Sequence, residues 1–156
     1  MYPNDREKCI AVSLPFLPEV SNFFWIDFGP EDMEHLLQAL TTFPTYEDFN
    51  PVNVAKVIID FDLVAQAKMK EYKEHFYSRF YFIRIGFEYT PVVYFVFDRK
   101  LMNDIIPGGY YELEACLKHF GVQLVKLAKK HKICADEQWM KISFDGEQNM
   151  YRFWWD

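Results

Sequence analysis

Two carboxylates stand one residue apart in the stretch VIIDFDLVA, residues 57–65. On a β-strand, Asp60 and Asp62 would project from the same face, and two carboxylates so placed can bind Mg²⁺ or Mn²⁺ for phosphoryl transfer. On a helix, the same residues lie about 200° apart around the axis, because each residue turns by about 100°. The secondary structure of this stretch therefore decides whether the chain has the start of a metal-dependent active site.

The spacing of apolar residues over 50–77 favours a helix. Asn50 followed by Pro51 is typical of an N-cap and a first helical residue. The β-branched and aromatic residues of 57–61 favour a strand instead, but the longer pattern outweighs them. On a helix, the two carboxylates lie on a solvated surface, with Lys56 pairing Asp60 one turn away. The apolar stripe comprises Val54, Ile58, Phe61, Ala65, Met69, Tyr72 and Phe76.

A second candidate site lies along one side of a predicted helix from about Tyr110 to His131. Glu112, Cys116 and His119 are spaced at i, i+4 and i+7. Cys116 and His119 can ligate a metal, or His119 can activate the thiol. No further ligands with matching spacing occur, and an isolated cysteine is usually a small buried hydrophobic residue. We therefore assign no catalytic residue, metal ligand or cofactor.

The one basic run, KLAKKHK at residues 126–132, ends the same helix. Lysine and histidine near a helix C-terminus complement its dipole and free carbonyls. Without interleaved aromatic residues or a basic surround, the run does not predict nucleic acid as the main ligand. Gly108 and Gly109 precede the helix, but IIPGGYYELE lacks a phosphate-loop pattern.

These residues must be positioned by one α+β domain spanning residues 1–156, long enough to bury a core. We predict an antiparallel or mixed sheet of about five to six strands, made of two hairpins plus N-terminal strands and packed with three helices. The stretch 101–109 is predicted to be a loop. The strands are expected at 8–15, 22–28, 79–89 and 92–99, with a closing hairpin over 137–156 that turns near Asp145 and Gly146; the helices are expected at 29–44, 50–77 and 110–131.

The C-terminal sequence YRFWWD is rich in aromatic residues. As a strand it places Tyr151, Phe153 and Trp155 on one face, and Met150, Arg152 and Trp154 on the other. One face is expected to fill the core. The other is either covered within the monomer or presented to a partner, since Trp, Tyr and Arg are typical interface anchors. A homodimer through this strand is one such arrangement.

Charge is distributed unevenly along the chain, whose net charge is −6. Residues 1–62 hold 11 acidic against 3 basic residues, whereas residues 63–156 hold 12 against 14. This asymmetry argues against nucleic acid as the main ligand and is compatible with a basic protein partner. No apolar run is long enough to span a membrane, so no membrane partner is predicted. Three widely spaced cysteines, with no CxxC pair, indicate a reducing compartment, and we expect a cytoplasmic protein.

The absence of a catalytic constellation favours a binding protein over an enzyme. We predict an intracellular inhibitor, of the immunity or anti-defence type, whose carboxylates replace phosphates in the cationic cleft of a basic, nucleic-acid-handling protein. Two alternatives stay open: a small Mg²⁺- or Mn²⁺-dependent phosphoryl-transfer enzyme that uses Asp60 and Asp62, and a homo-oligomeric structural or assembly protein. The predicted contact residues are Asp27, Glu31, Asp32, Glu34, Glu47 and Asp48.

Overall fold

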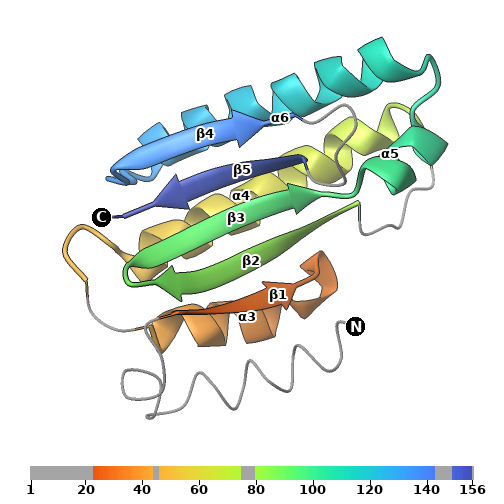
Figure 1. The fold of residues 1–156 in the computed structure, drawn as a ribbon. Coiled ribbons are helices and arrows are strands. Elements are labelled where there is room, and N and C mark those ends of the chain that lie inside the picture. The colour runs from red at the N-terminus through yellow and green to blue at the C-terminus, as the bar shows by residue number, and fades with distance from the viewer. Residues whose placement is uncertain (1–22, 44–45, 75–79, 143–148, 156) are drawn as a thin grey trace.

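The computed structural model describes residues 23–43, 46–74, 80–142 and 149–155. Five antiparallel strands form one sheet in the order β1-β2-β3-β5-β4 (Figure 1). The α+β class and the antiparallel sheet are confirmed. The strands are β1 (Phe23–Phe28), β2 (Tyr81–Glu88), β3 (Pro91–Phe97), β4 (Glu137–Lys141) and β5 (Asn149–Trp154). The helices are the 3-10 helix η1 (Pro30–Asp32), α3 (Met33–Thr41), α4 (Pro51–Lys70), α5 (Arg99–Ile105) and α6 (Tyr110–Lys130).

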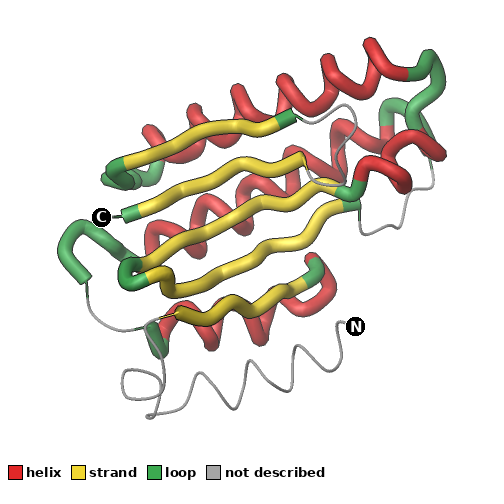
Figure 2. Tube along the Cα trace, in the orientation of Figure 1, coloured by secondary structure: helices red, strands yellow, loops and turns green. Residues whose placement is uncertain are grey.

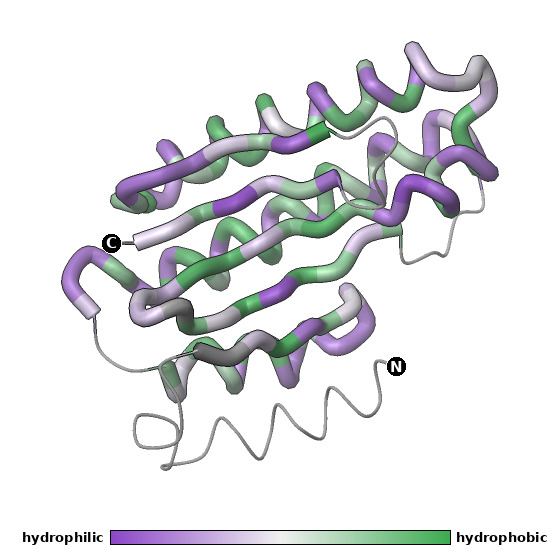
Figure 3. Tube along the Cα trace, in the orientation of Figure 1, coloured by the Kyte–Doolittle hydropathy of each residue, from purple (hydrophilic) through white to green (hydrophobic). Residues whose placement is uncertain are grey.

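The long helices all cover the same face of the sheet. Figures 1 and 2 show α3 behind β1, α4 behind the middle strands and α6 behind β4, with α5 at one end. Among the described residues, no helix lies on the opposite face. Strand hydropathy follows this arrangement, since central β3 is largely hydrophobic and edge strand β4 is largely hydrophilic (Figure 3). Charged residues at an exposed edge also discourage pairing with another chain.

Phe61 of α4 lies at the centre of the core. Its ring makes edge contacts with Tyr81 and Phe95 of the sheet and with Phe120 of α6, at centroid distances of 5.4, 5.1 and 5.7 Å. The same helical stripe buries Val54, Ile58, Ala65 and Met69. The prediction of a helix over 57–65 is therefore confirmed and the competing strand interpretation is wrong. The helix predicted to run to residue 77 ends at Lys70, and residues 71–72 form a turn. The end of the stripe at Phe76 lies outside the described residues.

Helix α6 also agrees with the sequence prediction. Its apolar stripe is buried throughout: Leu113, Leu117, Phe120, Leu124 and Leu127. Gly108 and Gly109 both adopt positive φ, at 98° and 73°, so the glycines serve the turn that starts the helix. The inward-facing residues Tyr151, Phe153 and Trp155 of β5 fill the core as expected.

The loop predicted over 101–109 is wrong in part, because α5 occupies Arg99–Ile105. The Asp98 side chain accepts a hydrogen bond from the Leu101 amide at 3.0 Å, which starts the helix. Only Met102 of α5 is buried, so its sequence has too few apolar repeats to indicate a helix. The sheet is therefore packed with four α-helices instead of three. The strand predicted at 8–15 and the turn at Asp145 and Gly146 lie outside the described residues.

Loss of the α4 N-cap should destabilise the fold measurably. The Asn50 side chain accepts hydrogen bonds from the amides of Val52 and Asn53, at 3.0 and 3.2 Å. We expect Asn50→Ala to lower the free energy of unfolding by about 1 kcal/mol, because two amides lose their acceptor. Urea denaturation measures the change. Asn50→Asp keeps an acceptor at this position and should remain close to wild type; equal losses in both variants would contradict the capping role.

Candidate functional site

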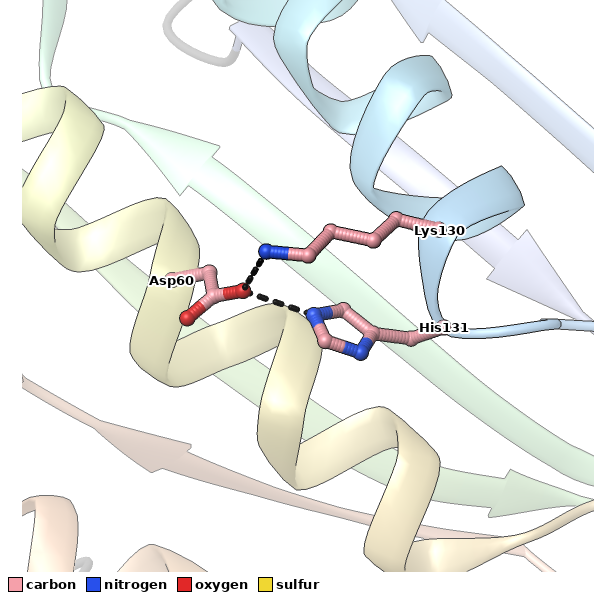
Figure 4. Close-up of polar contacts among 3 residues, drawn as sticks. All are labelled: Asp60, Lys130 and His131. Carbon is pink, nitrogen blue, oxygen red and sulfur yellow. Dashed lines mark hydrogen bonds and ion pairs between the residues drawn. The ribbon is translucent and has the colours of Figure 1, made fainter.

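The two carboxylates of α4 point to different neighbours. Asp60 Oδ2 lies 2.6 Å from His131 Nε2 and accepts a hydrogen bond from Lys130 Nζ at 3.3 Å (Figure 4). Asp62 Oδ1 instead accepts a hydrogen bond from the Tyr81 hydroxyl at 2.6 Å. One carboxylate therefore faces the end of α6 and the other faces β2. This is the divergence expected of residues i and i+2 on a helix.

This geometry does not form a shared metal site. No group of three or more His, Cys, Asp or Glu side chains able to hold a metal ion occurs in the part of the chain that the structure describes. The partners of Asp60 are Lys130 and His131, rather than Lys56 as expected from sequence. These partners hold the pKa of Asp60 below its ordinary value of 3.8, the hydrogen bond to His131 having the largest effect. Asp60 thus ties the middle of α4 to the end of α6.

Cys116 and His119 do not form an activated thiol. Cys116 is 1% exposed, and burial raises the pKa of its thiol to about 11. A nucleophilic cysteine needs a lowered pKa, so this thiol is unreactive at neutral pH. Burial also lowers the pKa of His119. His119 lines an open groove between α4 and α6, whereas Glu112 is exposed to solvent.

Two of the six predicted contact carboxylates are largely enclosed. Asp27 of β1 pairs with Arg84 of β2 through two contacts, Nε to Oδ1 at 2.7 Å and Nη2 to Oδ2 at 2.9 Å. Such a bidentate pair neutralises the carboxylate and ties the edge strand to its neighbour. Asp32 is 4% exposed at the junction of η1 and α3. These two residues support the local structure and offer little surface to a partner.

The other four predicted contact residues are exposed: Glu31, Glu34, Glu47 and Asp48. Glu31 and Glu34 lie at the start of η1 and α3, where carboxylates complement the helix dipole. Glu47 and Asp48 lie in the turn over 46–49, between α3 and α4. Helix α3 lies between the two pairs in sequence, and Glu47 follows its last residue, Thr41, by six positions. The structure thus places the four carboxylates in two pairs.

The turn that carries Glu47 and Asp48 is anchored to the core. Phe49 is buried, and its ring meets the Trp155 ring edge-on at a centroid distance of 4.8 Å. Its amide donates to the Tyr46 carbonyl at 3.3 Å, which closes the turn. The two acidic side chains are therefore presented on a turn whose base is fixed by aromatic packing.

No lysine or arginine occurs anywhere from residue 23 to residue 55. All six acids of that stretch are the predicted contact residues. We refer to Glu31, Glu34, Glu47 and Asp48 as the acidic edge. Glu31 and Glu34 follow β1, an outer strand of the sheet, whereas Glu47 and Asp48 lie on the turn that packs on Trp155, after β5.

A row of residues crosses the sheet face that carries no described helix. The strand registers align Asp27, Arg84, Tyr94, Arg152 and Trp139 from β1 to β4. The Arg152 guanidinium lies 5.6 Å from the ring centroids of both Tyr94 and Trp139. Cation–π contacts of this kind stabilise neighbouring strands. The sequence placed Arg152 on this face, but the row itself depends on a register that single-strand patterns do not contain.

Strand β5 is hydrogen-bonded on both sides, to β3 and to β4. Its backbone therefore has no open edge for pairing with a second copy. A homodimer through this strand would have to form through the outward side chains Met150, Arg152 and Trp154.

Comparison with known proteins found no family model, curated protein or solved structure that matches this chain. None of the helices in the described ranges combines the length and apolar character needed to cross a bilayer.

Removal of the Asp60 carboxylate should loosen the contact between α4 and α6. We expect Asp60→Asn to lower the free energy of unfolding by about 1 kcal/mol at pH 7, because Lys130 and His131 lose their charged acceptor. The lowered pKa of Asp60 stabilises the folded state above pH 3.8, and this contribution is lost as the pH falls through the folded value. Wild type and variant should therefore converge in strong acid when urea denaturation is repeated there. Lys56→Ala is the control and should change little.

Divalent metal should not stabilise the protein, because Asp60 and Asp62 point apart. We expect millimolar Mn²⁺ to leave the thermal midpoint of wild type unchanged, as in Asp62→Asn, when both are followed by thermal shift. A rise in wild type that Asp62→Asn abolishes would contradict this expectation and restore the metal-site interpretation.

Proposed function

We propose that this protein is a non-enzymatic cytoplasmic inhibitor that binds a basic, nucleic-acid-handling protein through its acidic edge. The observation that carries the proposal is the exposure of four carboxylates in a stretch, residues 23–55, that has no lysine or arginine. Exposed carboxylates create a negative surface potential that attracts a cationic partner.

The division of the acidic edge into two pairs suits an extended cationic cleft better than a small pocket. Glu31 and Glu34 lie at the start of η1 and α3, and Glu47 and Asp48 lie on the turn between α3 and α4. In a cleft that binds the nucleic-acid backbone, carboxylates at two places can replace phosphates at two places. In the proposal, long-range attraction steers the two proteins together, and contacts around α3 then hold the complex.

Asp27 and Asp32 take a supporting role in this proposal. Asp27 fixes β1 against β2 through Arg84, and Asp32 is buried where η1 meets α3. A rigid platform limits the entropy lost on binding and keeps the exposed carboxylates in place. The binding energy is then expected from the four exposed acids and from apolar contacts beside them.

Neutralising the acidic edge should abolish capture of the partner. We compare immobilised wild type with the variant E31Q/E34Q/E47Q/D48N in lysate of the source cells, washing at rising salt and identifying retained proteins by mass spectrometry. We expect wild type to retain a basic nucleic-acid-handling protein that elutes as salt rises, because surface charge pairs are screened by salt. The variant should not retain it.

The matched control carries the same kind of change elsewhere. Asp104 of α5 and Glu112 of α6 are both exposed, so Asp104→Asn/Glu112→Gln removes carboxylates without touching the acidic edge. This control should retain the partner as wild type does. Equal retention by the acidic-edge variant and wild type, or retention of no basic protein by wild type, would refute the proposed function.

A further inference from the structure

Helix α4 carries a second apolar stripe on the side that faces away from the sheet. The members of this stripe that are most exposed are Val52, Ile59 and Leu63, and Leu63 is 68% exposed. Ala67 continues the stripe one turn further and is also exposed. The spacing of seven, four and four residues places all of them on one side of the helix. Since the opposite side of α4 fills the core, this stripe has no role in the packing of the described residues.

A groove runs between this stripe and the neighbouring helix. Helices α4 and α6 are antiparallel, because Asp60 near the middle of α4 meets His131 after the end of α6, while Lys68 near the end of α4 lies across the groove from His119. The groove has a volume of about 340 Å³, and its lining residues are Val64, Ala67, Lys68, Glu71, His119 and Gln123. Two exposed apolar residues are adjacent in sequence to lining residues: Leu63 precedes Val64 on α4, and Val122, which is 51% exposed, precedes Gln123 on α6.

Two polar residues that line the groove, Lys68 and Glu71, form an ion pair with each other. Lys68 Nζ lies 3.0 Å from Glu71 Oε2 and 5.7 Å from the centroid of the Tyr72 ring. This pair is neutral as a unit, so the groove floor carries little net charge. The groove therefore has apolar lining from Val64 and Ala67 beside polar lining from both helices, which suits a segment that is itself amphipathic.

The exposed charges of the two helices are mostly positive, although the whole chain has a net charge of −6. Among the exposed residues of α4, its C-cap Glu71 and α6, six are lysines and two, Glu71 and Glu112, are acidic. Two of the lysines are ion-paired within the protein, Lys118 with Glu114 and Lys130 with Asp60. The six lysines are Lys56 and Lys70 of α4, and Lys118, Lys126, Lys129 and Lys130 of α6.

We propose that this groove binds an acidic amphipathic helix of a protein partner. In this arrangement, aliphatic residues at i, i+3, i+4 and i+7 of the partner helix contact Leu63, Ala67 and Val122, while its flanking carboxylates lie against the lysines. Charge complementarity selects an acidic partner, since six exposed lysines of the two helices outnumber the two exposed acids, Glu71 and Glu112. A concave groove between two helices fits a helix better than it fits a flat lipid surface.

This site is separate from the acidic edge and does not depend on the proposed function. The acidic edge lies at the start of η1 and α3 and on the turn before α4, whereas the groove is lined by residues within 64–71 and by His119 and Gln123. Helix α6 lies behind β4, at the opposite side of the sheet from β1 (Figure 1). The opposite charge of the two surfaces means that they select different partners.

The test uses a synthetic helical peptide of about 21 residues, long enough to form about six turns. It has leucine at i, i+3 and i+7, glutamate on the flanks of that stripe, and a fluorescent label. A peptide of the same composition in scrambled order is its control. Fluorescence anisotropy measures binding to the full-length protein, and sedimentation velocity records the oligomeric state.

Two double variants test the two components of the site. L63D/V122D replaces one exposed apolar residue on each helix with a charged one. K56E/K126E reverses the charge of one exposed lysine on each helix. All four residues are exposed, and circular dichroism checks that the variants fold. We expect each to weaken peptide binding roughly tenfold or more. The matched controls lie on other elements: K100E/K141E for charge, and Tyr89→Asp for an exposed hydrophobic side chain. Both controls should bind as wild type does.

Several outcomes would overturn the proposal. These are no binding of the peptide by wild type, equal binding of the scrambled peptide, or binding that neither double variant weakens. Binding to phosphatidylcholine–phosphatidylserine vesicles without binding to the peptide would assign the surface to lipid instead. A wild-type dimer that L63D/V122D dissociates would show that a second copy covers the groove. Selective binding of the amphipathic peptide, weakened by both double variants only, supports the proposal.

Discussion

The contact of Phe61 with the aromatic residues around it holds the layers of this fold together. One ring from α4 touches side chains of β2, β3 and α6, so the sheet and two helices meet at a single buried point. Phe97 and Phe120 stack beside it, with ring planes only 7° apart and centroids 5.5 Å apart. Contacts between aromatic rings stabilise a fold beyond the effect of the apolar area that the rings bury. This cluster therefore contributes more to stability than its buried area alone would give. Because the Phe61 side chain points into the core, the directions of the side chains next to it in the α4 sequence are fixed as well.

This constraint explains both Asp60 and Asp62. With Phe61 turned toward the sheet, the residues on either side lie on opposite flanks of the helix. One flank meets the C-terminal end of α6 and the other meets Tyr81 of β2. A pair of carboxylates that resembles a metal site in sequence is thus divided between two structural tasks.

The elements that sequence predicts best are those whose signal is local and repeated. Helices α4 and α6 each have a long apolar stripe, and Asn50 before Pro51 marks the start of α4. Helix α5 was missed because one buried residue, Met102, leaves no repeat to detect. The partners of the candidate site could not be predicted for a different reason. Asp27 with Arg84, and Asp60 with His131, are 57 and 71 residues apart, and only the three-dimensional arrangement brings them together. The exposure of each acid could not be predicted from the sequence either: Asp32 is buried and Glu34 is exposed, although both lie at the start of the same helical segment.

The order of the strands has a consequence for how the chain folds. Two pairings, β2 with β3 and β4 with β5, join neighbours in sequence and close short loops. The other two, β1 with β2 and β3 with β5, close over intervening helices, and the entropy cost of closing a loop rises with its length. Contacts between distant residues slow folding, so we expect the two hairpins to form early and the seam between β3 and β5 to form late. Phe95 of β3 and Phe153 of β5 are in ring contact across this pairing. Their contact is therefore expected to be among the last of the core to form.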